Sequence, residues 1–259
     1  MKNFKIVNFV NVFIYIFILA PLLVVIISSF NTAEYLVFPP QGFTFDWYNE
    51  VISKGRYTEP FWNSIKLAVV TTMITLPVGT MIAYAISRYK SRFNDLLQSF
   101  FLSPLVIPTL LLGIGLLILV SNLGVQMYFP RLLLAHVVIV IPYVVRTMIA
   151  GFAGMDKSIE QASIILGASP IKTFFLVTVP LARPALLASG FLSLVVSFDE
   201  LIIALFLTGP GFNTLPMTIY SDVQFNLSTS LAAISSLIIF GTVLLGLLAV
   251  LLMGVNKKS

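Results

Sequence analysis

The sequence has no cysteine, one histidine and few charged residues, since only 10% of its 259 residues are Asp, Glu, Lys or Arg. The lack of cysteine excludes disulfides, thiolate metal sites and cysteine nucleophiles, and the lone His136 excludes a zinc site built on paired histidines. Soluble domains average about a quarter charged and about half apolar residues. This chain is 58% apolar with a mean hydropathy of +1.02. This composition excludes a water-soluble domain and predicts a polytopic membrane protein.

Six stretches are long and apolar enough to cross a bilayer, which takes about 20 residues at roughly 1.5 Å each. Of the 25 charged residues, 20 fall between these stretches, which supports the boundaries. The first stretch exceeds the apolar core of a signal peptide and has no A-x-A-like cleavage site, so we expect a retained helix. We predict an all-α, single transmembrane domain over residues 1–259. Its spans are Phe9–Phe30, Phe61–Ser87, Leu96–Val120, Arg131–Ala150, Leu186–Leu207 and Leu231–Met253.

The basic residues predict the orientation, because lysine and arginine accumulate in cytoplasmic connectors. With a cytoplasmic N-terminus, ten basic residues lie inside and two, Lys54 and Arg56, lie outside. The ten are Lys2, Lys5, Arg88, Lys90, Arg92, Lys157, Lys172, Arg183, Lys257 and Lys258. We expect both termini in the cytoplasm.

Prolines inside the predicted spans, among them Pro104 and Pro108 in the third and Pro142 in the fourth, predict bent helices. Such bends serve either close packing or a pathway that opens and closes. The outer connector at 31–60 carries Trp47 and other aromatic residues, which either anchor it at the interface or contact an external partner.

The inner connector at 151–185 is too long for a simple turn. Ser158 and Gln161 fit a capping box that starts a helix at Ile159, and Gly167 is the residue type that ends one. Ser169 and Pro170 then supply an N-cap and a first-turn proline for a second short helix, which Pro180 would limit. The connector is predicted to be a helix, a bend and a helix on the cytoplasmic face.

Two interpretations of this hairpin stay open on composition. It is either an amphipathic segment on the inner leaflet, helped by its basic residues, or a protruding knob that fits the groove of a soluble partner. The apolar residues at helical spacing are Ile159, Ala162, Ile164, Ile165 and Leu166.

The stretch EQASIILGASPIKTFFLVTVP from Glu160 resembles the EAA loop of type I ABC-transporter permeases, whose pattern is E-A-A, three residues, G, nine residues, I-x-L-P. The match places residues 161–163 at E-A-A, Gly167 at the glycine and residues 177–180 at I-x-L-P. The resemblance implies that this segment docks an ATPase. The residues implied are Glu160, Gln161, Ala162, Gly167, Ala168 and Pro180, with the choice between Glu160 and Gln161 as the main contact left open.

The stretch SFDELIIALFLTGPGFNTLP at 197–216 is similar to the polyamine, opine and phosphonate branch of these permeases, in particular the second permease of spermidine/putrescine importers. The resemblance implies one permease subunit of a binding-protein-dependent importer in the bacterial cytoplasmic membrane. Its implied partners are a second permease, a cytoplasmic ATPase dimer that binds ATP and Mg²⁺, and an external solute-binding protein. The substrate implied is a polyamine, with a phosphonate, an opine or another small organic ion as alternatives.

Two carboxylates, Asp199 and Glu200, fall inside the fifth predicted span, where a charge costs at least about 2.5 to 3.5 kcal/mol and indicates function. On a continuous helix Glu200 would share a small, polar stripe with Ser193 and Ser197, and Asp199 would lie among apolar residues. Ser197, Asp199 and Glu200 are therefore candidates for the translocation path. The alternative is a structural pair with Lys66, Arg131, Arg146 or a partner subunit.

Other functions fit the sequence less well. It lacks the phosphate-binding motif G-x-x-x-x-G-K-[ST], so we expect no ATPase activity and no catalytic or metal-binding residues in this chain. A stand-alone transporter or channel is the remote alternative, but its halves at 1–130 and 131–259 show no repeat. An intramembrane protease is disfavoured because the two intramembrane acids are adjacent, and His136 is interpreted as a satisfied packing residue.

Overall fold

The computed structural model describes residues 2–53, 55–89 and 91–254, so Lys54, Lys90, Lys257 and Lys258 of the orientation argument lie outside the described residues. The described residues form helices and contain two isolated β-bridges but no strand. The first elements are α1 (Lys2–Ser28), α2 (Asp46–Ser53), α3 (Thr58–Arg88), α4 (Asn94–Leu102), the 3₁₀ turn η1 (Ser103–Leu105), α5 (Thr109–Asn122) and α6 (Tyr128–Ala153). They are followed by α7 (Lys157–Ile165), α8 (Pro170–Thr173), the π-helix η2 (Phe174–Thr178), α9 (Val179–Leu181), α10 (Arg183–Phe198), α11 (Ile202–Leu207), α12 (Leu215–Phe225) and α13 (Thr229–Gly254).

Four helices are long and apolar enough to cross a membrane, at residues 10–28, 58–88, 128–153 and 229–251. Two further candidates are bent pairs of helices, which raises the number to six among the described residues. Helix α1 is apolar on all sides, and its residues 10–24 are exposed. A helix of this kind suits a hydrocarbon environment rather than water.

The third predicted span, Leu96–Val120, is not one straight helix. It divides into α4 with η1 and then α5, and the two parts are bent by 100°. Pro104 lies in η1, and Pro108 is the N-cap of α5 with an extended ψ of 127°. Since proline lacks an N–H and constrains the residue before it, these two prolines account for the break.

The chain forms two compact units. The first comprises residues 1–61 and 218–247. In it the outer connector is held to the start of α13, because Thr229 donates from its backbone N–H to Glu34 O at 2.9 Å and from Oγ1 to Ala33 O at 2.6 Å. The connector is thus ordered by α13 as well as by its aromatic residues.

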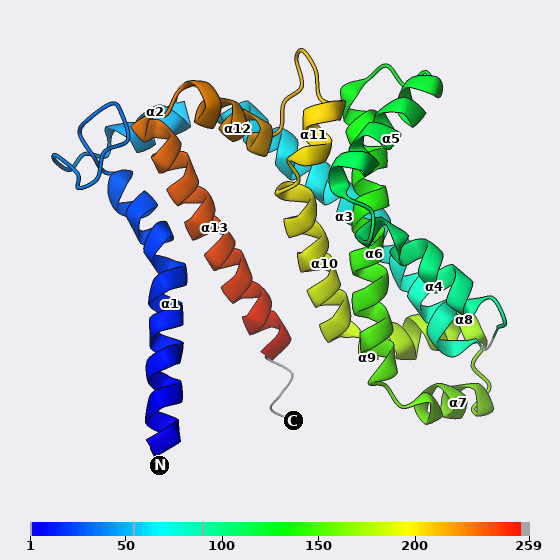
Figure 1. The fold of residues 1–259 in the computed structure, drawn as a ribbon. Coiled ribbons are helices and arrows are strands. Elements are labelled where there is room, and N and C mark those ends of the chain that lie inside the picture. Colours follow the sequence, from blue (N-terminus) through cyan, green and yellow to red (C-terminus); the bar gives the residue numbers. More distant parts are fainter. Residues whose placement is uncertain (1, 54, 90, 255–259) are drawn as a thin grey trace. The chain divides into compact units, whose positions relative to one another are not determined.

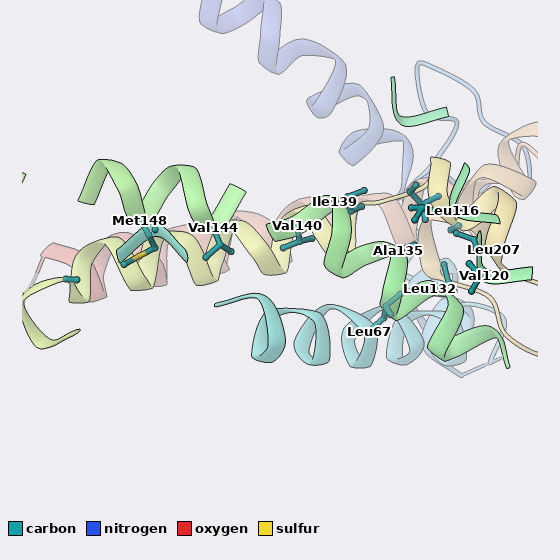
Figure 2. Close-up of a cluster of buried hydrophobic side chains, with 14 of the residues drawn as sticks. Leu67, Leu116, Val120, Leu132, Ala135, Ile139, Val140, Val144, Met148 and Leu207 are labelled. Atoms are coloured by element: carbon teal, nitrogen blue, oxygen red, sulfur yellow. The ribbon is translucent and has the colours of Figure 1, made fainter. Parts of the chain in front are cut away.

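The second unit comprises residues 62–217 and 248–259, and α6 runs through its apolar core. Leu132, Val140, Val144 and Met148 succeed one another along α6 and are fully buried (Figure 2). Helix α10 packs beside α6, and α7 lies beyond the C-terminal end of α6 (Figure 1). Glycine permits the close contact of α3 with α6, because a Cβ at Gly79 would lie 2.7 Å from Val144 Cγ1.

Candidate coupling segment and intramembrane carboxylates

The candidate coupling segment, defined as α7 to α9, begins with a capped helix. Asp156 is the N-cap of α7, and its Oδ1 accepts from the backbone N–H of Ser158 at 2.9 Å. This hydrogen bond lowers the pKa of the Asp156 carboxyl. The predicted capping box at Ser158 and Gln161 is therefore wrong, because the stronger acceptor two residues earlier starts the helix at Lys157 rather than at Ile159.

The predicted end of this helix at Gly167 is confirmed. Gly167 has a φ of +93° and donates to Ile164 O at 2.9 Å, while Ala168 N donates to Ser163 O at 3.1 Å. These two bonds form a Schellman motif, which favours glycine because an L side chain is strained at positive φ. A Cβ at Gly167 would meet nothing within 4 Å, so the constraint is on the backbone and not on space.

The second helix starts as predicted, with Ser169 Oγ accepting from Lys172 N at 3.3 Å and Pro170 in the first turn. Its predicted limit is confirmed to within one residue, because the helical stretch Pro170–Leu181 ends directly after Pro180 and is bent by 76° from α10. The five-residue π-helix η2 directly precedes α9. A π-turn changes which carbonyls need a donor, and so it accommodates a proline that an unbroken α-helix would not.

The far end of α7 carries the exposed apolar side chains of the segment. Leu166 is 88% exposed and Ile165 is 84% exposed, and Gln161 and Ala162 are also exposed. Ala168 is half-buried and Pro180 is exposed. This end of the segment is an apolar knob on a fixed turn.

Glu160 does not belong to that exposed surface. Its side chain is 10% exposed, and both of its oxygens accept from Nε of Arg88 at 3.0 Å. Of the two residues left open by the sequence, Gln161 is the one that faces outward.

The fifth predicted span, Leu186–Leu207, breaks at the two carboxylates. Helix α10 ends at Phe198, and α11 starts at Ile202, so Asp199 and Glu200 are not on one continuous helix. The predicted stripe that joined Glu200 to Ser197 is therefore wrong. Glu200 instead turns back to α11, where its Oε1 accepts from Ile203 N at 3.0 Å. Asp199 follows the C-terminal turn of α10 and is exposed.

The predicted structural pair within the chain is not formed by the described residues, in which no lysine or arginine nitrogen lies within 4.0 Å of either carboxylate. Lys66 and Arg146 are exposed, and Arg131 donates through Nε to Val125 O. Helix α10, at 16 residues and roughly 24 Å, is shorter than the hydrocarbon core. A break with uncompensated carboxylates is typical of transport sites.

Buried hydroxyls accompany the break. Ser197 is buried on the last turn of α10 and contacts Nδ1 of His136 on α6 at 2.8 Å. One turn earlier, Ser193 contacts Thr72 at 3.0 Å and Thr75 at 3.1 Å, both on α3. Nε2 of His136 has no hydrogen-bond partner among the described residues. The prediction that His136 is a satisfied packing residue therefore holds for one of its two ring nitrogens.

The family is decided by sequence comparison. Residues 75–258 match the family described as "Binding-protein-dependent transport system inner membrane component". The chain belongs to this family. It is 30% identical over 226 residues to the spermidine/putrescine transport system permease protein PotC of Escherichia coli K12, covering 87% of this chain and 85% of PotC. It is 31% identical over 250 residues to the putrescine transport system permease protein PotI of the same strain, covering 94% and 89%.

Solved structures agree with this assignment. A bacterial ABC transporter involved in the import of the acidic polysaccharide alginate has a TM-score of 0.70 at 19% identity, covering 100% of this chain and 97% of that chain. At this identity the similarity concerns the fold. The predicted fold and family are confirmed, and the chain is a multi-pass permease component of an ABC importer of the bacterial inner membrane.

Sequence reasoning missed the contact of Arg88 with Glu160 in this importer permease. The sequence assigned Arg88 to orientation alone, because it follows a span like other basic residues. One signal was available, since α7 is short and amphipathic and Glu160 is its one acidic residue. A carboxylate on the inward side of such a helix needs a cation.

Proposed function

We propose that this chain forms half of the translocation pathway of an ATP-driven polyamine importer and is driven through its coupling segment. The observation that carries the proposal is the exposed knob at Ile165 and Leu166, fixed by the Schellman turn at Gly167. A short, ordered helix with an apolar end suits the groove of a soluble partner and transmits a rigid-body movement.

The names of the relatives support a polyamine as substrate, since PotC is a spermidine/putrescine permease and PotI a putrescine permease. The break between α10 and α11 supports the same substrate class. Asp199 is exposed there beside the negative end of the α10 dipole, and both features attract a cation. A phosphonate or other anionic cargo would be repelled at this point.

The proposed assembly has three further parts. A second, homologous permease supplies the other half of the pathway, and a cytoplasmic ATPase dimer binds ATP and Mg²⁺ and receives the knob. An external binding protein delivers the solute. Both termini of this chain lie in the cytoplasm, as the excess of basic residues in the connectors supports.

Leu166→Asp tests the coupling role, with Leu123→Asp as a matched control. Leu123 is also the C-cap of a helix, is 64% exposed and precedes a positive-φ glycine, Gly124. The control lies beyond the opposite end of α6, which is roughly 39 Å long. Each chain is co-expressed with the ATPase, the second permease and the binding protein of the proposed importer.

We expect Leu166→Asp to abolish co-purification of the ATPase and ATP-driven spermidine uptake, because it places a charge in an apolar contact. Leu123→Asp keeps both. Retention of the ATPase and of uptake by Leu166→Asp would contradict the proposed coupling role. An equal loss of ATPase binding and uptake in both variants would show general damage to the protein. It would also contradict a specific role of the knob.

A further inference from the structure

Arg88, the last residue of α3, joins three segments. Its Nε donates to both carboxylate oxygens of Glu160 on α7 at 3.0 Å, and its Nη1 donates to the backbone oxygen of Phe152 at 3.1 Å. The Phe152 carbonyl lies in the last turn of α6 and also accepts from the backbone N–H of Met155 at 3.2 Å. One guanidinium therefore contacts both α7 and the C-terminal end of α6.

The contact is buried, since the side chain of Arg88 is 6% exposed and that of Glu160 is 10% exposed. Removing two charges from water is costly, and apolar side chains of similar volume generally stabilise a protein as well or better. Stability alone gives no reason for an ion pair here. A planar guanidinium does supply a fixed distance and direction between the helices that it joins.

Aromatic rings extend the same contact by one turn of α3. The ring of Tyr84 lies 5.7 Å from that of Phe152 on α6 and 4.8 Å from that of Phe174 in η2, measured between centroids. Across the hairpin, Ser163 Oγ on α7 contacts Thr173 Oγ1 on α8 at 3.1 Å. Both arms of the coupling segment are thus attached to the C-terminal end of α3, although neither is next to α3 in sequence.

The other half of α3 reaches the carboxylate break. Thr72 and Thr75 contact Ser193, which lies one turn before Ser197 on α10. From Thr75 to Arg88 the helix rises roughly 20 Å. A single helix therefore touches the coupling segment at one end and the helix that carries the break at the other.

We propose that Arg88 is a positioning residue for coupling, which makes α7 move together with α3 so that a displacement of the coupling segment reaches α10 through α3. The inference rests on the proposed function, because it takes α7 as the ATPase contact. Beyond the proposed function, we name α3 as the element that carries the movement to α10, rather than the direct chain connection through α9. The Arg88–Glu160 pair stays closed throughout the transport cycle.

The lack of cysteine allows a direct test. Arg88 and Glu160 are both replaced by cysteine in the full complex, and the two thiols are joined by a short bis-methanethiosulfonate reagent. Each single cysteine variant, treated identically, controls for reaction with other subunits. The readouts are co-purification of the ATPase, ATPase stimulation by the loaded binding protein, and spermidine uptake.

We expect the unbridged double variant to keep the ATPase bound but to lose stimulation and uptake at least about tenfold, within the range for coupled contacts. The bridge restores both, and reduction removes them again. A bridged complex that stays inactive overturns the proposal, because α7 then has to move relative to α3. An unbridged complex of normal activity overturns it too, because the pair then positions nothing.

A second variant tests the proposal if the double cysteine chain does not assemble with its partners. Glu160→Gln keeps the size of the side chain and one acceptor for Arg88 Nε but removes the charge. We expect its uptake per ATP hydrolysed to fall several-fold with unchanged ATPase binding, and an unchanged ratio overturns the proposal. Failure of the proposed function would look different, since the unmodified complex would then neither bind the ATPase nor take up spermidine.

Discussion

Glu200 and Asp199 are neighbours in sequence but face different surroundings. Glu200 Oε1 accepts from Ile203 N at 3.0 Å and so closes the first turn of α11, whereas Asp199 is exposed after the last turn of α10. Helical geometry does not describe the two carboxylates, because α10 ends at Phe198 and α11 starts at Ile202, with both residues in the break between them. We therefore expect the two carboxylates to have different tasks, one local and one directed outward.

Replacing each of these carboxylates by its amide separates the two tasks. Asp199→Asn should raise the KM for spermidine uptake roughly tenfold, which corresponds to about 1.4 kcal/mol of lost attraction. Glu200→Gln should change the KM less, because an amide oxygen still accepts from Ile203 N. Uptake kinetics in proteoliposomes measure both, and an unchanged KM in Asp199→Asn would remove Asp199 from the path.

Gly167→Ala tests the turn of the coupling segment against a matched turn elsewhere. Gly124 has a φ of +68° and closes the same Schellman motif at the end of α5, and a Cβ at either glycine meets nothing within 4 Å. Each alanine should cost about 1 to 2 kcal/mol of stability because of the left-handed backbone.

The unfolding temperature in detergent should therefore fall by a similar amount in Gly167→Ala and Gly124→Ala. ATPase stimulation should fall in Gly167→Ala alone. Equal stimulation in the two variants would show that the orientation of the knob does not matter.

Ser197→Ala should destabilise the second unit through His136. The substitution leaves both ring nitrogens of a buried histidine without a partner among the described residues, which costs about 1 to 3 kcal/mol. Ser189→Ala is the matched control, since Ser189 is buried on the same helix but donates to Leu186 O of its own helix. A chemical denaturation series that shows equal losses would contradict the importance of the contact.

Tyr57 should make the stability of the first unit depend on pH in the alkaline range. Burial, and then the 2.6 Å hydrogen bond that Tyr57 donates to Asp222, raise the pKa of the phenol. Since the folded pKa is raised, this stabilisation is complete below the unfolded pKa of about 10 and is lost as the pH rises above it.

Tyr57→Phe should lower stability at pH 8, because among the described residues it leaves the Asp222 carboxylate with Arg56 as its one side-chain partner. It should also reduce the loss of stability between pH 9 and 11. These pH values are roughly one unit either side of the unfolded pKa. Unfolding temperatures at several pH values measure the effect. Parallel curves for the variant and the unmodified chain would contradict it.

Local chemistry in the sequence predicted the helical fold and much of the coupling segment. Gly167 ends α7 and Ser169 with Pro170 starts α8, because both signals act within one turn of the chain. The start of α7 was missed because Asp156 and Ser158 are both good caps, and their competition is decided by small differences.

The remaining errors depend on contacts between distant segments. Whether Asp199 and Glu200 continue a helix depends on their surroundings, and so does the partner of Glu160, which lies 72 residues away at Arg88. Spacing along the sequence predicts which residues share a face only while the helix continues. Asp199 and Glu200 lie where it does not.

The most direct test of the central claim is uptake of labelled spermidine and putrescine by proteoliposomes that contain this chain, its second permease and the ATPase, with the binding protein outside. We expect uptake that needs internal ATP and Mg²⁺ as well as the binding protein. Sulfoquinovosyl glycerol, the substrate named for a 25% identical permease of Agrobacterium fabrum, should not compete. Uptake by this chain alone without ATP, or uptake that polyamines do not inhibit, would contradict the account.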